Sequence, residues 1–81
     1  MTKPITFPLS ALPEGGQARV CALHLKGGMR RRLQDLGLVT GTHVTCLQRA
    51  SAGDPTAYLI RGAVIALRRD DAVQIEMEVA P

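Results

Sequence analysis

Residues 29–41 read MRRRLQDLGLVTG, and the three consecutive arginines suggest a handle for nucleic acid or another anion. A helix turns by about 100° per residue, so Arg30, Arg31 and Arg32 would point in three different directions. Arginines splayed in this way do not form one basic stripe. Arg31 and Asp35 stand four residues apart and are expected to pair on the outside of the helix. The arginines therefore indicate the solvated side of a helix and not a nucleic-acid motif.

The apolar residues of the same stretch follow a helical period. Met29, Leu33 and Leu36 are spaced four and three residues apart, which places them on one face of a short amphipathic helix. Gly37 stands where a left-handed C-terminal cap would fall. We expect a helix over residues 29–36 that docks on the core through Leu33 and Leu36.

Short apolar segments on either side of this helix predict strands. They cover residues 17–25, 43–48, 56–60, 64–67 and 73–79, with a single helical turn at residues 9–12 before them and a tight turn at residues 68–72. The segment 17–25 is apolar on both faces, which is typical of a strand in the middle of a small barrel. The dipeptide Arg61-Gly62 predicts a hairpin turn between the third and fourth strands.

The last of these segments has the clearest alternation of apolar and polar residues. The residues expected to face the core are Val73, Ile75, Met77 and Val79. Five short strands with a helix inserted between the first two predict a mainly β fold, a small SH3-like barrel of antiparallel strands. A five-stranded OB-fold would place its helix between later strands.

The composition excludes several kinds of binding. The 81 residues predict one domain over residues 1–81, of which 46% are hydrophobic. Phe7 and Tyr58 are its only aromatic residues, so neither a groove for proline-rich peptides nor a stacking platform for single-stranded nucleic acid can be assembled. The net charge of +3 fits an acidic partner but decides nothing by itself.

The sequence offers no expected membrane span or secretory signal. The longest apolar run, residues 63–67, is far too short to cross a bilayer. Residues 1–9, MTKPITFPL, have no extended apolar core. We therefore expect a cytoplasmic protein, with Cys21 and Cys46 as reduced thiols.

Catalysis is not predicted. The Gly15-Gly16 and Gly27-Gly28 pairs lack the Lys-Ser/Thr that follows the glycine in a phosphate-binding loop. Ser10 and Ser51 fall in turns, and no base can be assigned to either. The expectation is a protein that is not an enzyme.

Two Cys and two His residues form the one pattern that suggests a metal. The sequence contains Cys21-x-x-His24 and the reverse order, His43-x-x-Cys46, so antiparallel strands could place like residues opposite one another. Within a strand, residues three apart point to opposite faces, which argues against a four-ligand site. We expect no required cofactor, and adventitious binding of zinc or iron by His24 or His43 at exposed strand ends.

Four motifs, in order, carry a resemblance to a known family. They are PLSALPEGG at residues 8–16, Arg30-x-x-Leu33-x-x-Leu36-Gly37-Leu38-x-x-Gly41, Gly53-Asp54-Pro55 and Ile65-Ala66-Leu67-Arg68-x-x-Asp71-Ala72. Their order and spacing resemble the FeoA family over essentially the whole chain. Two positions depart from the pattern: Thr40 replaces the proline usual before Gly41, and Ser51 replaces a proline common in that loop.

The resemblance implies an accessory protein of bacterial ferrous iron uptake. Such a protein works with FeoB, a membrane protein with a cytosolic GTP-binding domain that moves Fe(II), and would lie at the inner membrane through this partner as a monomer or weak dimer. Similar modules occur fused to iron-dependent repressors, so a nucleic-acid-associated or repressor-type module is the alternative. We expect the partner to meet Arg30, Arg31, Arg32 and Leu38, because arginine stems and forks are enriched at interfaces.

Overall fold

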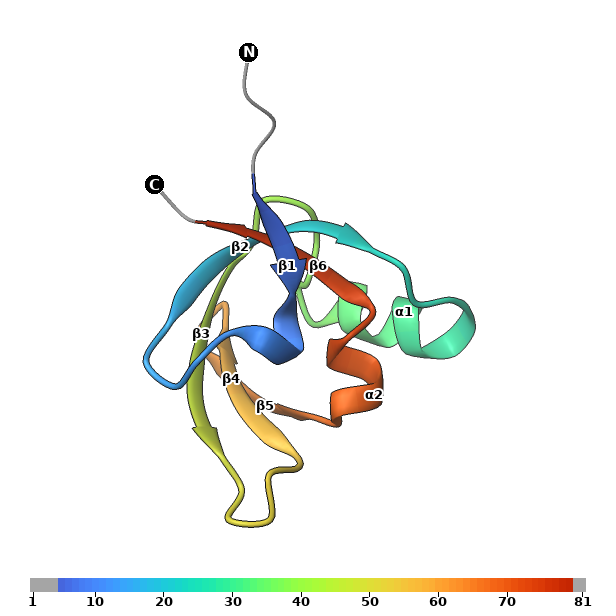
Figure 1. Ribbon diagram of the computed structural model, residues 1–81. Coiled ribbons are helices and arrows are strands. Elements are labelled where there is room, and N and C mark those ends of the chain that lie inside the picture. The colour runs from blue at the N-terminus through green and yellow to red at the C-terminus, as the bar shows by residue number, and fades with distance from the viewer. Residues whose placement is uncertain (1–4, 80–81) are drawn as a thin grey trace.

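The computed structural model describes residues 5–79, and its strands form one antiparallel six-stranded sheet (Figure 1). The elements are β1 (Thr6–Pro8), η1 (Leu9–Ala11), β2 (Gln17–Leu23), α1 (Gly27–Asp35), β3 (His43–Arg49), β4 (Thr56–Ile60), β5 (Ala63–Leu67), α2 (Arg69–Ala72) and β6 (Ile75–Val79). The strand order is β1-β6-β2-β3-β4-β5. The predicted mainly β, SH3-like architecture is confirmed, with α1 between the two strands that the sequence indicated. The additional strand is β1, which at three residues is too short to show a periodic pattern.

Strand β2 lies inside the sheet, between β6 and β3, as its two apolar faces predicted. Its burial does not alternate regularly, because Val20 and Leu23 are both buried although they are three residues apart. The register against β6 shifts between Val20 and Ala22, which leaves Cys21 as the extra residue of a β-bulge. The bulge changes the phase of the alternation, so the second half of the strand turns its other set of side chains to the core.

The hairpin between β4 and β5 forms where it was predicted. Ile60 pairs with Ala63 across the two-residue turn of Arg61 and Gly62. Both turn residues have positive φ, 49° and 82°, as a type I′ turn requires. Gly62 adopts this region without strain, whereas Arg61 is held there as a non-glycine residue.

Strand β6 is shorter than predicted. Ile75 and Met77 are fully buried, in agreement with the alternation, but Val73 and Val79 are exposed. Val73 is not in the strand, because residues 69–72 form the short helix α2 and Val73 follows as its C-cap. Val79 is the last residue of the strand, at the end of the sheet. The core is therefore made by the middle of β6 and not by its whole length.

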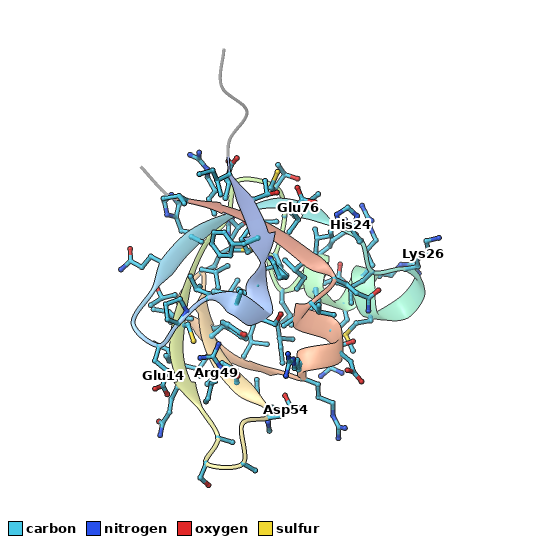
Figure 2. All side chains as sticks on the ribbon, in the orientation of Figure 1. Glu14, His24, Lys26, Arg49, Asp54 and Glu76 are labelled. Atoms are coloured by element: carbon cyan, nitrogen blue, oxygen red, sulfur yellow. The ribbon has the colours of Figure 1, made fainter. Side chains whose placement is uncertain are left out.

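The chain before β2 is fixed to the barrel by buried leucines and by one arginine. Leu9 and Leu12 are buried, as expected of a single turn. The Arg49 guanidinium donates to the carbonyl oxygens of Ser10 and Leu12 at 3.0 and 2.9 Å, and the Arg49 backbone N–H donates to the Glu14 carboxylate at 2.8 Å. Figure 2 labels Arg49 and Glu14, whose side chains lie at the same end of the molecule. These bonds close one end of the barrel, so Arg49 has a structural role.

Among residues 5–79, no helix is long and apolar enough to cross a membrane. Residues 1–4, which belong to the N-terminal segment considered above, lie outside the described part of the chain.

Candidate functional site

Helix α1 begins two residues earlier than predicted and docks through Leu33, which is 2% exposed. Gly37 has φ of 100°, the predicted left-handed cap. The expectation that Leu36 also docks was wrong, since 42% of its surface is exposed. The helix ends at Asp35, and Leu36 is its C-cap residue. Leu36 therefore lies at the rim of the core.

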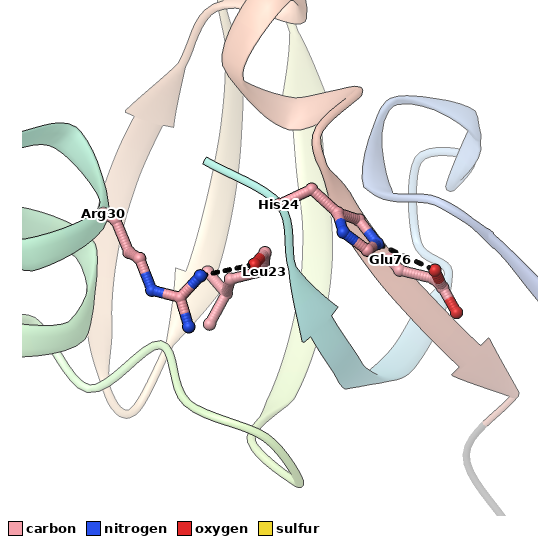
Figure 3. Close-up of polar contacts among 4 residues, drawn as sticks. All are labelled: Leu23, His24, Arg30 and Glu76. Atoms are coloured by element: carbon pink, nitrogen blue, oxygen red, sulfur yellow. Dashed lines mark hydrogen bonds and ion pairs between the residues drawn. The ribbon is translucent and has the colours of Figure 1, made fainter. Parts of the chain in front are cut away.

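Arg30 points back toward the strand that precedes the helix. Its guanidinium donates to the carbonyl oxygen of Leu23 at 2.7 Å (Figure 3) and approaches that of Leu25 at 3.4 Å. Hydrogen bonds from a charged donor to carbonyl groups are stronger than neutral ones. Arg30 therefore ties the start of α1 to the end of β2. The partner contact expected of Arg30 stays a prediction.

Arg31 and Arg32 are exposed on α1. The predicted ion pair between Arg31 and Asp35 is not formed: within residues 5–79, the ion pairs are Arg19–Glu78 and His24–Glu76. Both guanidinium groups therefore remain available for an external carboxylate or phosphate. Whether a partner uses them stays a prediction.

Leu38 was expected on the partner surface but is fully buried. Its backbone N–H donates to the carbonyl oxygen of Leu33 at 2.9 Å, which folds the chain back under the end of α1 and inserts the side chain into the core. The exposed leucine beside the arginines is Leu36. The reading of Leu38 as a surface residue failed because the left-handed turn at Gly37 reverses the chain direction.

A groove of about 210 Å³ lies beside these arginines, between α1 and the strand β5. It is lined by Met29, Arg32, Leu33 and Leu36 on the helix side and by Ile65, Ala66, Leu67, Arg68 and Asp71 on the other. Its floor is apolar and its rim is charged, with two cations and one carboxylate. Such a surface suits an apolar side chain of a partner with acidic neighbours. We call it the α1–β5 groove.

His24 follows β2 directly and lies against β6. Its Nε2 atom is 2.9 Å from Oε1 of Glu76 (Figure 3). This hydrogen bond is the main cause that lowers the pKa of Glu76. Burial raises the pKa of the Cys21 thiol, and the negative charges of Glu76 and Glu78 raise it further. The prediction that Cys21 and His24 point to opposite faces was wrong, because the bulge at Cys21 shifts the alternation of the strand. Val20 and Leu23 are both buried, and both Cys21 and His24 lie close enough to Glu76 to feel its charge or bond to it.

His43 lies elsewhere, exposed at the start of β3. In the register of β2 with β3 it stands opposite Arg19, so neither the His24–His43 nor the Cys21–Cys46 juxtaposition occurs. Cys46 is fully buried, and burial raises the pKa of its thiol. Within residues 5–79, no group of three or more His, Cys, Asp or Glu side chains is arranged to hold a metal ion.

Sequence reasoning missed Glu76 as the partner of His24, and it missed the role of Arg68 in the groove. Glu76 was read only as a solvent-facing residue of a regular strand, and no spacing in the sequence connects it to a residue 52 positions away. Arg68 was read only as part of a turn.

The fold and this groove define the class of protein: a small SH3-like barrel with a basic, partly apolar surface beside its one long helix. The FeoA domain family model matches residues 7–79. The chain therefore belongs to the FeoA domain family.

Several relatives agree with this assignment. A fusion protein of Fe(2+) transport protein A and the Fe(2+) transporter FeoB from Porphyromonas gingivalis is 38% identical over 71 residues, which is 88% of this chain and 8% of that protein. The FeoA protein of Chlorobium tepidum superposes with a TM-score of 0.88 at 35% identity, covering 93% of this chain and 71% of that one. FeoA of Stenotrophomonas maltophilia, an SH3 domain protein crystallised with zinc, has a TM-score of 0.78 at 28% identity, covering 89% of each chain.

A manganese-dependent transcriptional repressor is similar in fold alone. It shares 18% identity with a TM-score of 0.85, and the matched part is 45% of its chain. At this identity the likeness shows that the barrel recurs in regulators of transcription, and it carries no function to this chain.

Proposed function

We propose that this protein is an accessory component of ferrous iron uptake that works in the cytoplasm by docking on the cytosolic GTP-binding part of a FeoB-type transporter. The observation that carries the proposal is the Porphyromonas gingivalis relative, in which a segment like this chain is joined to FeoB. Fusion gives two modules a high effective concentration for one another, which favours a working contact between them. The role is one of binding, and no reaction is assigned to the chain.

The surface that best suits this contact is the end of α1. Arg31 and Arg32 carry charge that no described carboxylate neutralises, and Leu36 supplies an exposed apolar neighbour. Arginine stems and forks are enriched at protein interfaces, and exposed charges at the rim of an interface steer association. Of the expected set, we keep Arg31 and Arg32 and replace the buried Leu38 by the exposed Leu36. Arg30 is exposed as well, but its guanidinium is bonded to the Leu23 carbonyl.

Metal binding is a second and smaller part of the proposal. His24 with Glu76 offers one imidazole nitrogen and one carboxylate, which is too few ligands for a closed site but enough to recruit a divalent ion together with water or a second molecule. His43 offers an exposed imidazole only. The zinc complex of the Stenotrophomonas maltophilia protein supports adventitious binding of this kind.

The test is a parallel titration of the purified chain with the transporter's cytosolic domain and with labelled duplex DNA and RNA, at about 50 mM and about 200 mM salt. We expect saturable binding to the domain, weakened by the double reversal Arg31→Glu and Arg32→Glu. Since these residues contribute mainly to steering, the loss should lie in the association rate and shrink at the higher salt. Tight, steeply salt-dependent binding to nucleic acid, with none to the domain, would establish the nucleic-acid alternative instead.

A further inference from the structure

The two edges of the sheet are protected very differently. The edge strand β1 has three residues and ends in Pro8, so it offers little to another strand. The opposite edge is β5, whose sequence AVIAL contains no charged residue, no proline and no glycine (Figure 1). Natural proteins usually protect an exposed edge with charges, prolines or bulges. β5 has none of these and is an open template for strand pairing.

The backbone of β5 has groups free to pair. Its residues form a regular ladder with β4, starting from the turn pair Ile60 and Ala63. In an antiparallel ladder successive residues direct their N–H and C=O groups to alternate sides, and the pair next to a two-residue turn is hydrogen-bonded. Val64 and Ala66 therefore direct their N–H and C=O groups away from β4. Within residues 5–79, no backbone hydrogen bond outside this ladder uses residues 63–67.

Side chains on both sides of this edge would contact an added strand. Val64 is 66% exposed, and Leu59, its neighbour across the ladder, is partly exposed on the same face. Ile65 and Leu36 border the α1–β5 groove on the other face. An extended segment with apolar residues would bury these groups while its main chain completes the ladder.

The charges around the edge select an acidic segment. Arg61 stands at one end of β5 and Arg68 at the other. Arg32 lies on the rim of the groove, where Asp71 is the one carboxylate, so the arginines remain in excess. None of the three is within 4.0 Å of a described carboxylate, since the ion pairs of residues 5–79 involve other groups. The stem of Arg61 lies against Gly37, where any side chain would collide with it, so this arginine is held next to the end of α1. Antiparallel pairing of β5 with a second copy of itself would bring arginines face to face, which disfavours a dimer through this edge.

We propose that β5 receives an extended segment of its partner, with apolar residues at the centre and acidic residues at both ends, as a further antiparallel or parallel strand of the sheet. The identity of the partner as a FeoB-type transporter rests on the function proposed above, whereas the edge and its chemistry do not. The five residues of β5 correspond to about 17 Å of extended chain, so the recognised segment is short.

The direct test is amide hydrogen exchange of the full chain, measured residue by residue by NMR. The probes are the transporter's cytosolic domain and a capped peptide of sequence EEVTVTEE, with KKVTVTKK as the charge-reversed control. Binding should slow exchange at the Val64 and Ala66 amides by about tenfold or more, because free outward N–H groups become hydrogen-bonded. The amide of Ile65, already paired with Tyr58 in the ladder, should change much less, and the lysine peptide should have no effect.

Two variants at one position separate the main chain from the side chain. Val64→Pro removes an outward N–H without removing a bond to β4, and it should raise the Kd for the partner by about tenfold or more. Val64→Thr keeps the N–H and the β-branched shape and should change the Kd by less than about threefold. An NMR spectrum of each variant shows whether the barrel is intact, and the exchange measurement on the unmodified protein decides the question if Val64→Pro does not fold.

Each result has a defined meaning. If the transporter domain binds but protects neither Val64 nor Ala66, the edge inference is wrong and the proposed function stands. If the acidic peptide protects both amides and the domain does not bind, the edge inference stands and the proposed partner is wrong. If neither probe protects these amides, or if self-association of the free chain protects them, the inference is overturned.

Discussion

Two leucines three residues apart, Leu33 inside α1 and Leu36 at its C-cap, give the most direct test of how the helix is held. Leu33 is 2% exposed and belongs to the core cluster, whereas Leu36 is 42% exposed at the rim of the α1–β5 groove. Replacing a buried leucine by alanine costs the transfer free energy of the lost methyl groups plus the energy of the cavity, about 2–5 kcal/mol. Leu33→Ala is expected in this range, and Leu36→Ala below about 1 kcal/mol because water already reaches it.

The size of the protein makes this difference easy to measure. At 0.05–0.15 kcal/mol per residue, the whole domain has about 4–12 kcal/mol of stability, so Leu33→Ala removes a large part of it. Urea denaturation followed by far-UV circular dichroism gives the free energy of unfolding of each variant. The melting temperature should fall by roughly 8 °C or more for Leu33→Ala, at about 4 °C or more for each kcal/mol. Equal losses for the two variants would refute the docking described above.

Three further predictions use the same purified protein. Arg30→Ala should lower the free energy of unfolding by about 1 kcal/mol, because it removes the bond to the Leu23 carbonyl. Arg31→Ala, as the control, should change this free energy by less than about 0.5 kcal/mol. Equal effects of the two variants in urea denaturation would exclude a structural role for Arg30. Thermal melts with and without a chelator should coincide, and a large drop on chelation, abolished by His24→Ala, would show that a metal is part of the fold. Iodoacetamide should alkylate Cys21 and Cys46 more slowly than free cysteine near pH 8, because the raised pKa of each thiol lowers its thiolate fraction. Fast labelling of the buried Cys46, detected by mass spectrometry, would show that the barrel opens locally.

The architecture could be predicted because its signals are local. The spacing of apolar residues in the α1 segment, the turn at Arg61-Gly62 and the alternation around Ile75 and Met77 each report on a few neighbouring residues. Those are the positions where the structure agrees with the sequence. A short strand such as β1 gives no such signal, because three residues do not establish a period.

The candidate site could not be predicted in full because it depends on non-local geometry. The bulge at Cys21 changes which side chains meet Glu76, and nothing in the local sequence requires it. The turn at Gly37 was recognised, but its effect of burying Leu38 and exposing Leu36 follows only from the direction in which the chain leaves the helix. The bond from Arg30 to Leu23 likewise depends on how α1 packs beside the end of β2. The sequence patterns therefore predicted least well which side chains at the candidate site are exposed and which are buried.

The central claim is that the chain supports ferrous iron uptake by contact through the end of α1. The measurement that tests it most directly is the rate of Fe(II) uptake by cells of the source organism that lack this gene, complemented with the wild-type chain or with the double variant Arg31→Glu and Arg32→Glu. Immunoblots must show equal protein levels, and Leu36→Ala serves as a milder change on the same surface. Uptake should be low in the deletion strain, restored by the wild type, restored partly by Leu36→Ala and not restored by the double variant. Uptake that is unchanged by the deletion would contradict the central claim.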